Sequence, residues 1–471
     1  MAEESFAERI RRLRRDAPAV APAKPAAAAE AAETSARDPS WLRERLARHR
    51  DRGGSRRFAP AASPAGPVGH TRTSGPPRDL VERRCARGAF GARVILRPAT
   101  ECHGSLAFAD VAGAQDLGFL ARDPALEVLD PRACIYLDIE TTGLSGGAGT
   151  WPFLIALGRF VGSDFELWQG FLRDPSEEAA LLEETARRIA ESAGVISFFG
   201  KSFDRHRLED KMRLHRIEAP FDSRPHLDLY HPLNRLYTRR AGWERLAPGR
   251  AAPPDAGFPD GRLGTMERGL LGLVRELDLS GAHAPAAWFD FLAGRPHLLE
   301  EVFRHNAIDV WSLATLTAHL GRTLVERGPQ GEPLAGPALA RALGLAAIHR
   351  DRADRADESY WLARVVERLG DAPEPRALVR WRADNLRLAG DGAAALALFE
   401  ELAGVLDEHT PAVEVARAKL LEHHAHDLPA ALAACAAARA AAELVLAPKA
   451  GARFLVELEV RVARLEGKLA P

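Results

Sequence analysis

Short apolar runs alternate with longer segments of helical periodicity between residues 131 and 322. Runs with the length and apolar character of strands occur at 133–139, 153–160, 165–171, 195–199 and 221–229. Helical periodicity occurs at 176–192, 203–215, 266–276 and 298–320. The first three runs follow one another directly, as in an antiparallel meander, whereas helices separate the later ones, as in parallel strands. The pattern predicts an α/β domain with a mixed sheet flanked by helices.

The C-terminal part, residues 335–467, has a helical pattern throughout and contains a repeated motif. Residues 390–396 read Gly-Asp-Gly-Ala-Ala-Ala-Leu, and residues 426–432 read His-Asp-Leu-Pro-Ala-Ala-Leu. The shift of about 36 residues is near the roughly 34-residue period of tetratricopeptide repeats. We expect an all-α domain of tetratricopeptide-like repeats, with a plain helical bundle as the alternative.

The N-terminal part divides into two segments. Residues 1–78 are rich in Ala, Pro, Gly, Ser and Arg, which predicts a disordered tail with two candidate short helices at 5–15 and 40–50. Residues 1–100 carry 21 Lys plus Arg against 11 Asp plus Glu, so the tail is either a flexible linker or a basic arm that binds nucleic acid. Residues 79–130 contain a strand-like run and an apolar stretch, and we expect them to pack on the α/β domain, residues 131–322.

Composition narrows the class of protein. The hydrophobic content of 46% is ample for packed cores, and the formal net charge of −1 excludes an overall basic protein. The 4 cysteines have no spacing typical of a zinc site or a disulfide framework, which favours a cytoplasmic location. No uninterrupted apolar run approaches a membrane span, so we expect no membrane association.

Two acidic side chains at the end of the first strand suggest catalytic chemistry. Asp138 and Glu140 follow the apolar run 133–137 and are two residues apart, so on a strand they lie on the same face. Two neighbouring buried carboxylates need a counter-charge, and Mg²⁺ or Mn²⁺ prefers such oxygen ligands. The sequence therefore predicts a metal site.

Further candidate ligands lie at the start of one helix and inside another. Asp204 lies at a strand-to-helix junction, just after Lys201. His305 and Asp309 are four residues apart in the helix predicted at 298–320, so they lie on one helix face. Lys201 is either a phosphate contact or a solvated side chain, while Asp228 and Asn306 are candidates for outer positions of the site.

Together these motifs resemble those of the DEDD exonucleases, and in particular bacterial ribonuclease H-like proteins of the YprB type, which are often joined to tetratricopeptide-like repeats. The likeness covers roughly residues 90–320. The segments that carry it are 138–160, 200–204, 226–229, 289–292 and 305–313. It implies a ribonuclease H-like fold and a metal-dependent nuclease that digests single-stranded DNA or RNA from 3′ to 5′.

The resemblance also implies roles for individual residues. Two Mg²⁺ or Mn²⁺ ions would be held by Asp138, Glu140, Asp204 and Asp309, and His305 would act as general base. The terminal nucleotide would contact Thr141, Thr142, Gly143 and Leu144. His305 stands four residues before Asp309, the spacing of the family's tyrosine subgroup, whereas its histidine subgroup has a spacing of five.

Other functions are weighed against this one. Residues 143–150 are rich in glycine but lack the lysine that a nucleotide-binding P-loop requires. A non-catalytic nucleic-acid-binding or scaffold protein with a decayed nuclease site is the main alternative, although all four acids are present. In a third interpretation the helical repeats recruit a protein partner and the nuclease domain is secondary.

Overall fold

The computed structural model describes residues 76–143, 149–275 and 283–470. Nearly all of the predicted tail, including its two short helices, lies outside the described residues, as do Leu144 and the last residue of the helix predicted at 266–276.

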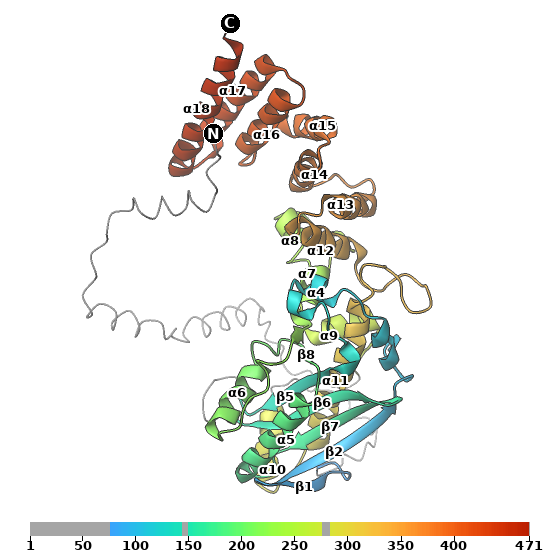
Figure 1. The fold of residues 1–471 in the computed structure, drawn as a ribbon. Helices are drawn as coiled ribbons and strands as arrows, with labels where there is room; N and C mark the ends of the chain where they lie inside the picture. Colours follow the sequence, from blue (N-terminus) through green and yellow to red (C-terminus); the bar gives the residue numbers. More distant parts are fainter. Residues whose placement is uncertain (1–75, 144–148, 276–282, 471) are drawn as a thin grey trace, which may run out of the picture. The chain divides into compact units, whose positions relative to one another are not determined.

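A seven-stranded mixed sheet forms the centre of the α/β part, in the order β1-β2-β7-β6-β5-β8-β9 (Figure 1). The strands are β1 (Val81–Cys85), β2 (Gly88–Pro98), β5 (Ile135–Thr141), β6 (Pro152–Val161), β7 (Asp164–Phe171), β8 (Val195–Ser197) and β9 (His226–Asp228). Strands β5, β6 and β7 form an antiparallel meander, and β8 and β9 continue the sheet parallel to β5. The predicted mixed sheet is confirmed.

The segment before this domain contributes to the same sheet. Strand β2 pairs antiparallel with β7 and β1 pairs with β2, so two strands come from residues 79–130. The remainder forms the two-residue strands β3 (Cys102–His103) and β4 (Leu106–Ala107), the 3₁₀ helix η1 (Phe108–Gly113) and the helix α4 (Leu117–Ala121). The segment was expected to pack on the α/β domain. In the structure it also forms part of that domain's sheet through backbone hydrogen bonds.

Several predicted boundaries are corrected by the structure. The runs at 195–199 and 221–229 yield only the three-residue strands β8 and β9. The helix expected at 266–276 is α9 (Leu263–Met266) followed by the π-helical turn η5 (Glu267–Leu271). It ends at Gly272, whose φ of 63° is a left-handed conformation that glycine adopts without strain. The segment before α9 contains the short helix α8 (Trp243–Leu246).

The helix α11 (Leu299–Leu320) packs against the central strands and joins the two sides of the core. Its N-terminal apolar residues belong to the same core cluster as those of α5 (Glu178–Ala190), α6 (Asp204–Leu214) and α10 (Ala284–Leu292). Its C-terminal apolar residues belong to a second cluster, with those of η1, α4 and α7 (Tyr230–Tyr237). A Cβ at Gly158 of β6 would lie 2.6 Å from Val310 of α11, so this glycine permits the close approach of helix and sheet.

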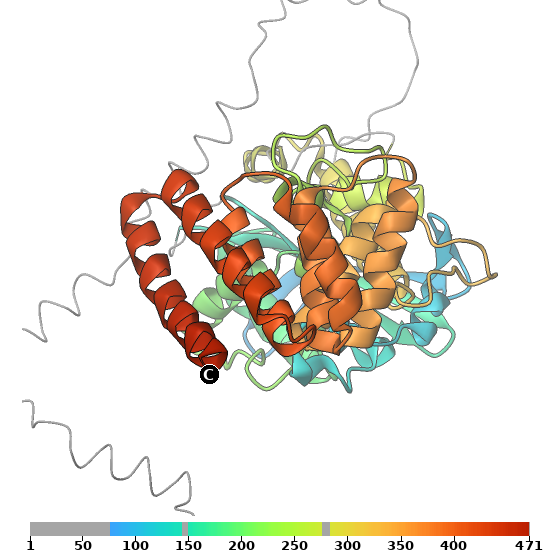
Figure 2. The ribbon, with the colours of Figure 1, turned by 90° about the horizontal axis from the view of Figure 1, so that it is seen from above.

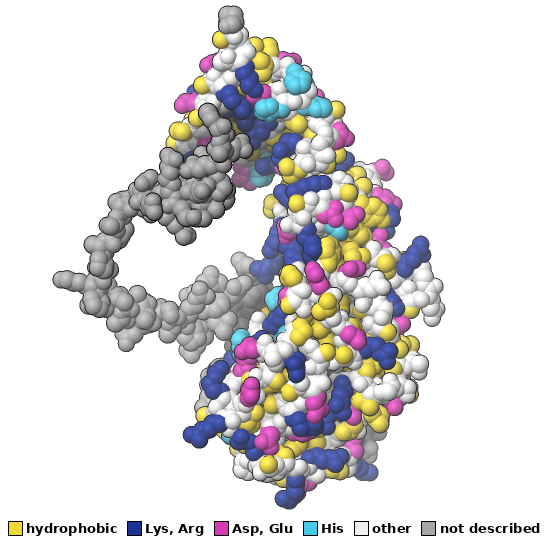
Figure 3. All heavy atoms as spheres, in the orientation of Figure 1, with side chains coloured by type: hydrophobic (Ala, Val, Ile, Leu, Met, Phe, Trp, Pro, Cys, Tyr) yellow, Lys and Arg dark blue, Asp and Glu magenta, His cyan; other side chains and the backbone are white. Residues whose placement is uncertain are grey.

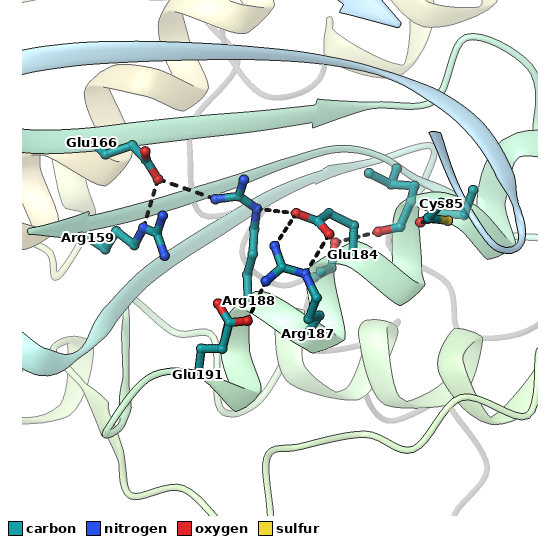
Figure 4. A network of polar contacts seen from close by, with 10 residues as sticks. Cys85, Arg159, Glu166, Glu184, Arg187, Arg188 and Glu191 are labelled. Atoms are coloured by element: carbon teal, nitrogen blue, oxygen red, sulfur yellow. Dashed lines mark hydrogen bonds and ion pairs between the residues drawn. The ribbon is translucent and has the colours of Figure 1, made fainter. Parts of the chain in front are cut away.

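Ion pairs join α5 to the meander, as Figure 4 shows. Arg188 bridges Glu184 on its own helix and Glu166 on β7, with Nε–Oε1 and Nη1–Oε1 distances of 2.7 and 3.3 Å. Its guanidinium carbon also lies 4.7 Å from the centroid of the Trp168 ring. These contacts fix the orientation of α5 on the sheet.

The C-terminal part consists of helices α12 to α18 (Figure 1 and Figure 2). Their bounds are α12 (Ala338–Asp351), α13 (Arg355–Leu369), α14 (Arg376–Ala389), α15 (Gly392–Ala403), α16 (Thr410–His423), α17 (Leu428–Val445) and α18 (Pro448–Leu469). Helix α12 packs on α7, so its leucines belong to the same core as the α/β part. The predicted all-helical C-terminal region is confirmed.

A capped turn repeats between these helices. Asp354, Asp391 and Asp427 are the N-caps of α13, α15 and α17, and each side chain accepts a hydrogen bond from a backbone N–H three residues later. The preceding residues have φ values of 59°, 94° and 55° (Ala353, Gly390 and His426). The motif seen twice in the sequence therefore occurs three times in the structure.

Among the described helices, α17 is long and apolar enough to cross a membrane by length and composition alone. Core helices of helical domains pass the same test, and α17 packs along α16 and α18.

Candidate active site

Asp138 and Glu140 lie at the end of β5, next to an irregularity in its pairing. The register between β5 and β6 shifts between Glu140 and Thr141, and such bulges redirect side chains. Asp138 Oδ2 accepts a 2.7 Å hydrogen bond from Asn306 Nδ2 of α11. The structure thus brings the first acidic motif against the helix that carries Asp309.

A buried hydrogen-bond chain fixes Asn306 in turn. Gln169 of β7 donates from Nε2 to Asn306 Oδ1 at 2.7 Å and to the Phe303 carbonyl at 2.9 Å. Arg93 of β2 donates from Nε to Gln169 Oε1 at 2.7 Å. Because an amide oxygen must face a donor, this chain orients the Asn306 amide so that its NH₂ group points to Asp138. The sequence analysis included Asn306 but missed Gln169 and Arg93, which no local motif marks.

Asp204 is positioned by a tight turn between β8 and α6. Asp228 of β9 accepts hydrogen bonds from the backbone N–H groups of Phe199 and Lys201 at 2.7 and 3.1 Å. A Cβ at Gly200 would lie 3.1 Å from Asp204 Oδ2 and 2.4 Å from Ser197 Oγ, so the turn requires a glycine here. Asp228 therefore supports the turn that places Asp204 in the site.

Asp309 lies in an ion-pair network with a residue that the sequence analysis did not identify. Arg275, 10% exposed, pairs with Asp309 and with the fully buried Glu267. Arg275 Nη1 also donates to His305 Nδ1 at 3.1 Å, and His305 Nε2 lies 3.6 Å from Asp309 Oδ2. Since arginine can only donate, Nδ1 is the acceptor nitrogen of His305 in this arrangement.

The network continues away from the site into the N-terminal strands. Ser312 Oγ donates to Glu267 Oε1 at 2.5 Å and lies 2.9 Å from His103 Nε2 of β3. Burial, followed by the charges of Arg97 and Arg275, lowers the pKa of His103 to about 4, so this imidazole is neutral at physiological pH. It can therefore donate to Ser312 without adding charge.

The four carboxylates influence one another strongly. Burial raises the pKa of Asp138 well above its usual value, and Asp309, Asp204 and Glu140 raise it further. The pKa of Glu140 is raised to about 8 by burial and then by Asp309 and Asp204. The pKa of Asp204 is raised to about 8 by burial and then by Asp228 and Asp309. The structure thus brings Asp138, Glu140, Asp204 and Asp309 into one electrostatic cluster, from β5, α6 and α11.

The predicted substrate contacts have local partners. Thr141 Oγ1 donates to the Gly143 carbonyl, and Thr142 Oγ1 accepts from the Trp151 N–H, each at 3.0 Å. The second bond joins the residue that follows β5 to the residue that precedes β6. Lys201, 36% exposed in its side chain, has its Nζ 3.4 Å from Asp123 Oδ2. Thr141 and Thr142 directly follow Glu140, and Lys201 precedes Asp204 by three residues, whereas Leu144 lies outside the described residues.

The donor set fits a hard divalent cation. Four acids share one partly buried site, and in the ion pairs given above only Asp309 has a cationic partner. A bound cation would therefore stabilise the ionised forms of Asp138, Glu140 and Asp204. Among the described residues, three ligand atoms within 4.8 Å of one another occur at His349, Asp354 and Asp357 and not among the four acids of the site. There Asp354 already caps α13 and accepts from His349 Nδ1 at 3.2 Å, which accounts for that cluster without a metal.

Comparison with known proteins agrees with this fold. Residues 135–321 match the model of the RNase H superfamily. The chain is 28% identical over 238 residues to the uncharacterized protein YprB of Bacillus subtilis (strain 168), a match covering 50% of this chain and 53% of that relative. The match thus spans about half of the relative's length. The predicted likeness to YprB-type proteins is confirmed. Members of the superfamily are generally nucleases that use divalent metal ions and bind nucleic acid.

Proposed function

Because residues 135–321 form a ribonuclease H-like domain, we propose that this protein is a divalent-metal-dependent exonuclease of the DEDD type. It would hydrolyse phosphodiester bonds of single-stranded nucleic acid from the 3′ end. The observation that carries the proposal is the cluster of four carboxylates, in which burial and the neighbouring negative charges raise the pKa values of Asp138, Glu140 and Asp204. A site that serves only stability would not collect like charges that each disfavour ionisation.

Each residue of the site would have a separate role in the reaction. Asp138, Glu140, Asp204 and Asp309 would hold two Mg²⁺ or Mn²⁺ ions, which when bound supply positive charge for the attacking water and the leaving 3′ oxygen. Asn306, fixed by Gln169, keeps the Asp138 carboxylate directed into the site. His305 would accept the proton of the attacking water, and Nδ1 becomes available for this when Arg275 releases it.

A matched pair of acids on α6 tests the proposal. Asp204 is buried in the cluster, whereas Asp210 on the same helix is exposed and pairs with Arg213. We expect Asp204→Asn to abolish Mn²⁺-dependent degradation of end-labelled single-stranded DNA and RNA, and Asp210→Asn to retain it. Labels at the 5′ and 3′ ends distinguish the direction of digestion. Equal activity of the two variants would exclude Asp204 as a metal ligand.

One observation favours a second candidate, a nucleic-acid-binding scaffold without catalysis. Arg275 supplies Asp309 with a counter-charge from within the protein, as a decayed metal site would require. Calorimetric titration with Mn²⁺ separates the two functions, because a scaffold needs no bound ion. A saturable signal that Asp204→Asn removes favours the nuclease, and its absence in the parent protein favours the scaffold.

A further inference from the structure

A cationic pocket lies between the α/β part and the first helices of the C-terminal part. Its volume of about 420 Å³ falls within the roughly 300–1,000 Å³ typical of ligand sites. Its walls include Arg122 after α4, Arg245 of α8, Arg350 and Asp351 of α12, and Trp381 of α14. We call it the arginine pocket. In Figure 3, Lys and Arg side chains gather over the region where Figure 1 places α8 and α12.

The arginine pocket carries more positive charge than its surroundings neutralise. Asp351 is its single acid and pairs with Arg122. Within the described chain, the exposed Arg245 and Arg350 have no carboxylate within 4.0 Å. Outside the pocket lining, burial and then the charge of Arg122 lower the pKa of Arg235 to about 10, and Asp351 offsets part of this effect. An anionic ligand would offset the excess positive charge of the pocket.

Aromatic rings lie beside these cations. The guanidinium carbon of Arg350 lies 5.3 Å from the centroid of the Trp381 ring, and both residues line the pocket. Outside the pocket lining, the guanidinium carbon of Arg352 lies 5.2 Å from the centroid of the Phe119 ring. Arginines next to aromatic faces are typical of surfaces that bind a single nucleic-acid strand, where phosphates meet the charges and bases stack on the rings.

Two ion pairs connect the turn before Asp204 with the arginine pocket, Lys201–Asp123 and Arg122–Asp351. Lys201, in the turn that precedes Asp204, pairs with Asp123, which is adjacent in sequence to Arg122. At the start of the same turn, Phe199 is 47% exposed, and its ring centroid lies 5.0 Å from that of Tyr230. Residues 122 and 123 thus contact both the turn that carries Lys201 and Asp351 of the pocket.

We propose that the arginine pocket binds the phosphate backbone of the strand whose 3′ end enters the carboxylate site. The inference rests on the proposed function and adds a strand anchor remote from the cleaved bond. Short substrates would react without reaching the anchor, and longer strands would be retained by it. The protein would then cleave one strand several times before it releases that strand.

Charge reversal tests the anchor. The double variant Arg245→Glu/Arg350→Glu changes two exposed arginines, and Arg439→Glu/Arg453→Glu on α17 and α18 is the matched control. We measure binding of a labelled 20-nucleotide strand by fluorescence anisotropy in EDTA at several salt concentrations. The pocket variant should bind at least about 10-fold more weakly at low salt, with the slope of log K against log salt smaller by about 1.4, because each lost phosphate contact contributes about 0.7. The control should match the parent.

Turnover provides the second readout. Hydrolysis of a dinucleotide should be unchanged in the pocket variant, whereas kcat/KM on the 20-nucleotide strand should fall. The anchor would be overturned if the pocket variant kept the parent's affinity and salt slope, or if it lost dinucleotide hydrolysis. Binding of polyglutamate, a model of an acidic protein, is measured as well. If the variant lost affinity only for polyglutamate, the pocket would bind an acidic protein partner instead of a nucleic-acid strand. The parent protein could also bind the strand through the two arginines without cleaving any substrate. The proposed nuclease function would then be wrong, whereas the assignment of the pocket as a strand-binding site would be supported.

Discussion

At the scale of single residues, Arg275 is the side chain on which the site's ion pairs depend. It neutralises Glu267, which is fully buried, and Asp309 at the edge of the site. We predict that Arg275→Met lowers the free energy of unfolding by about 3–5 kcal/mol, the usual cost of leaving one partner of a buried pair uncompensated. Urea unfolding followed by circular dichroism measures this change.

The double variant Arg275→Met/Glu267→Gln should recover much of that loss, because it also removes the buried negative charge. Arg295→Met is the control, since Arg295 is 70% exposed in its ion pair with Asp290 and should change stability by less than about 1 kcal/mol. An Arg275→Met variant as stable as the parent would contradict the dependence of Glu267 and Asp309 on Arg275.

His305 carries the second prediction at this scale. If it accepts the proton of the attacking water, His305→Ala should lower kcat by roughly 10²–10⁴-fold, the usual contribution of a general base. Binding of Mn²⁺ should change little, because the carboxylates are retained. Near-normal turnover from pH 6 to 9 would assign His305 a structural role next to Arg275.

At the scale of elements, the repeated turn of the C-terminal helices explains the similarity of residues 390–396 and 426–432. Each turn needs a left-handed residue followed by an Asp that caps the next helix, and His426 occupies the position that Gly390 fills elsewhere. We predict that His426→Gly raises the free energy of unfolding by about 0.5–1 kcal/mol, since non-glycine residues are strained there.

Two alanine variants provide the control. Gly390→Ala, at φ 94°, should destabilise, whereas Gly467→Ala lies within α18 with no atom near its Cβ and should stabilise by up to about 1 kcal/mol. Thermal melting of the helical signal measures the three variants. The same sign for both alanine substitutions would contradict the conformational explanation.

At the scale of the whole molecule, the carboxylate cluster links stability to pH and metal. Glu140 and Asp204 have ordinary pKa values of 4.5 and 3.8, and both are raised to about 8 in the folded protein. The folded state therefore binds more protons than the unfolded chain within that window. With a chelator present, stability should be greatest at acid pH and should fall as pH rises toward 8.

A divalent cation should reverse this trend, because it stabilises the ionised carboxylates. We predict that 5 mM Mn²⁺, about the concentration that saturates a weak site, raises Tm more at pH 8 than at pH 5.5. Asp204→Asn should reduce the difference and Asp210→Asn should leave it unchanged. An equal rise in Tm at both pH values would show that the stabilisation by Mn²⁺ does not depend on the ionisation of these carboxyl groups.

The sequence by itself determined the features that depend on neighbouring residues. Short apolar runs identified the meander, and helical periodicity identified the helices α5, α6 and α11, because both patterns mark the residues that an element buries. The spacing of Asp138 and Glu140, and of His305 and Asp309, placed each pair on one face. The roles of these residues, and of the N-terminal tail, stay predictions.

Only the tertiary structure decided which distant groups meet. Arg275 contacts Asp309, which is 34 positions away, and Gln169 contacts Asn306, which is 137 positions away. The pairing of β2 with β7 and the arginine pocket likewise join segments that no local pattern relates. The physical reason is that long-range pairing of buried polar groups depends on how the whole chain packs, since each must find a partner wherever the fold supplies one.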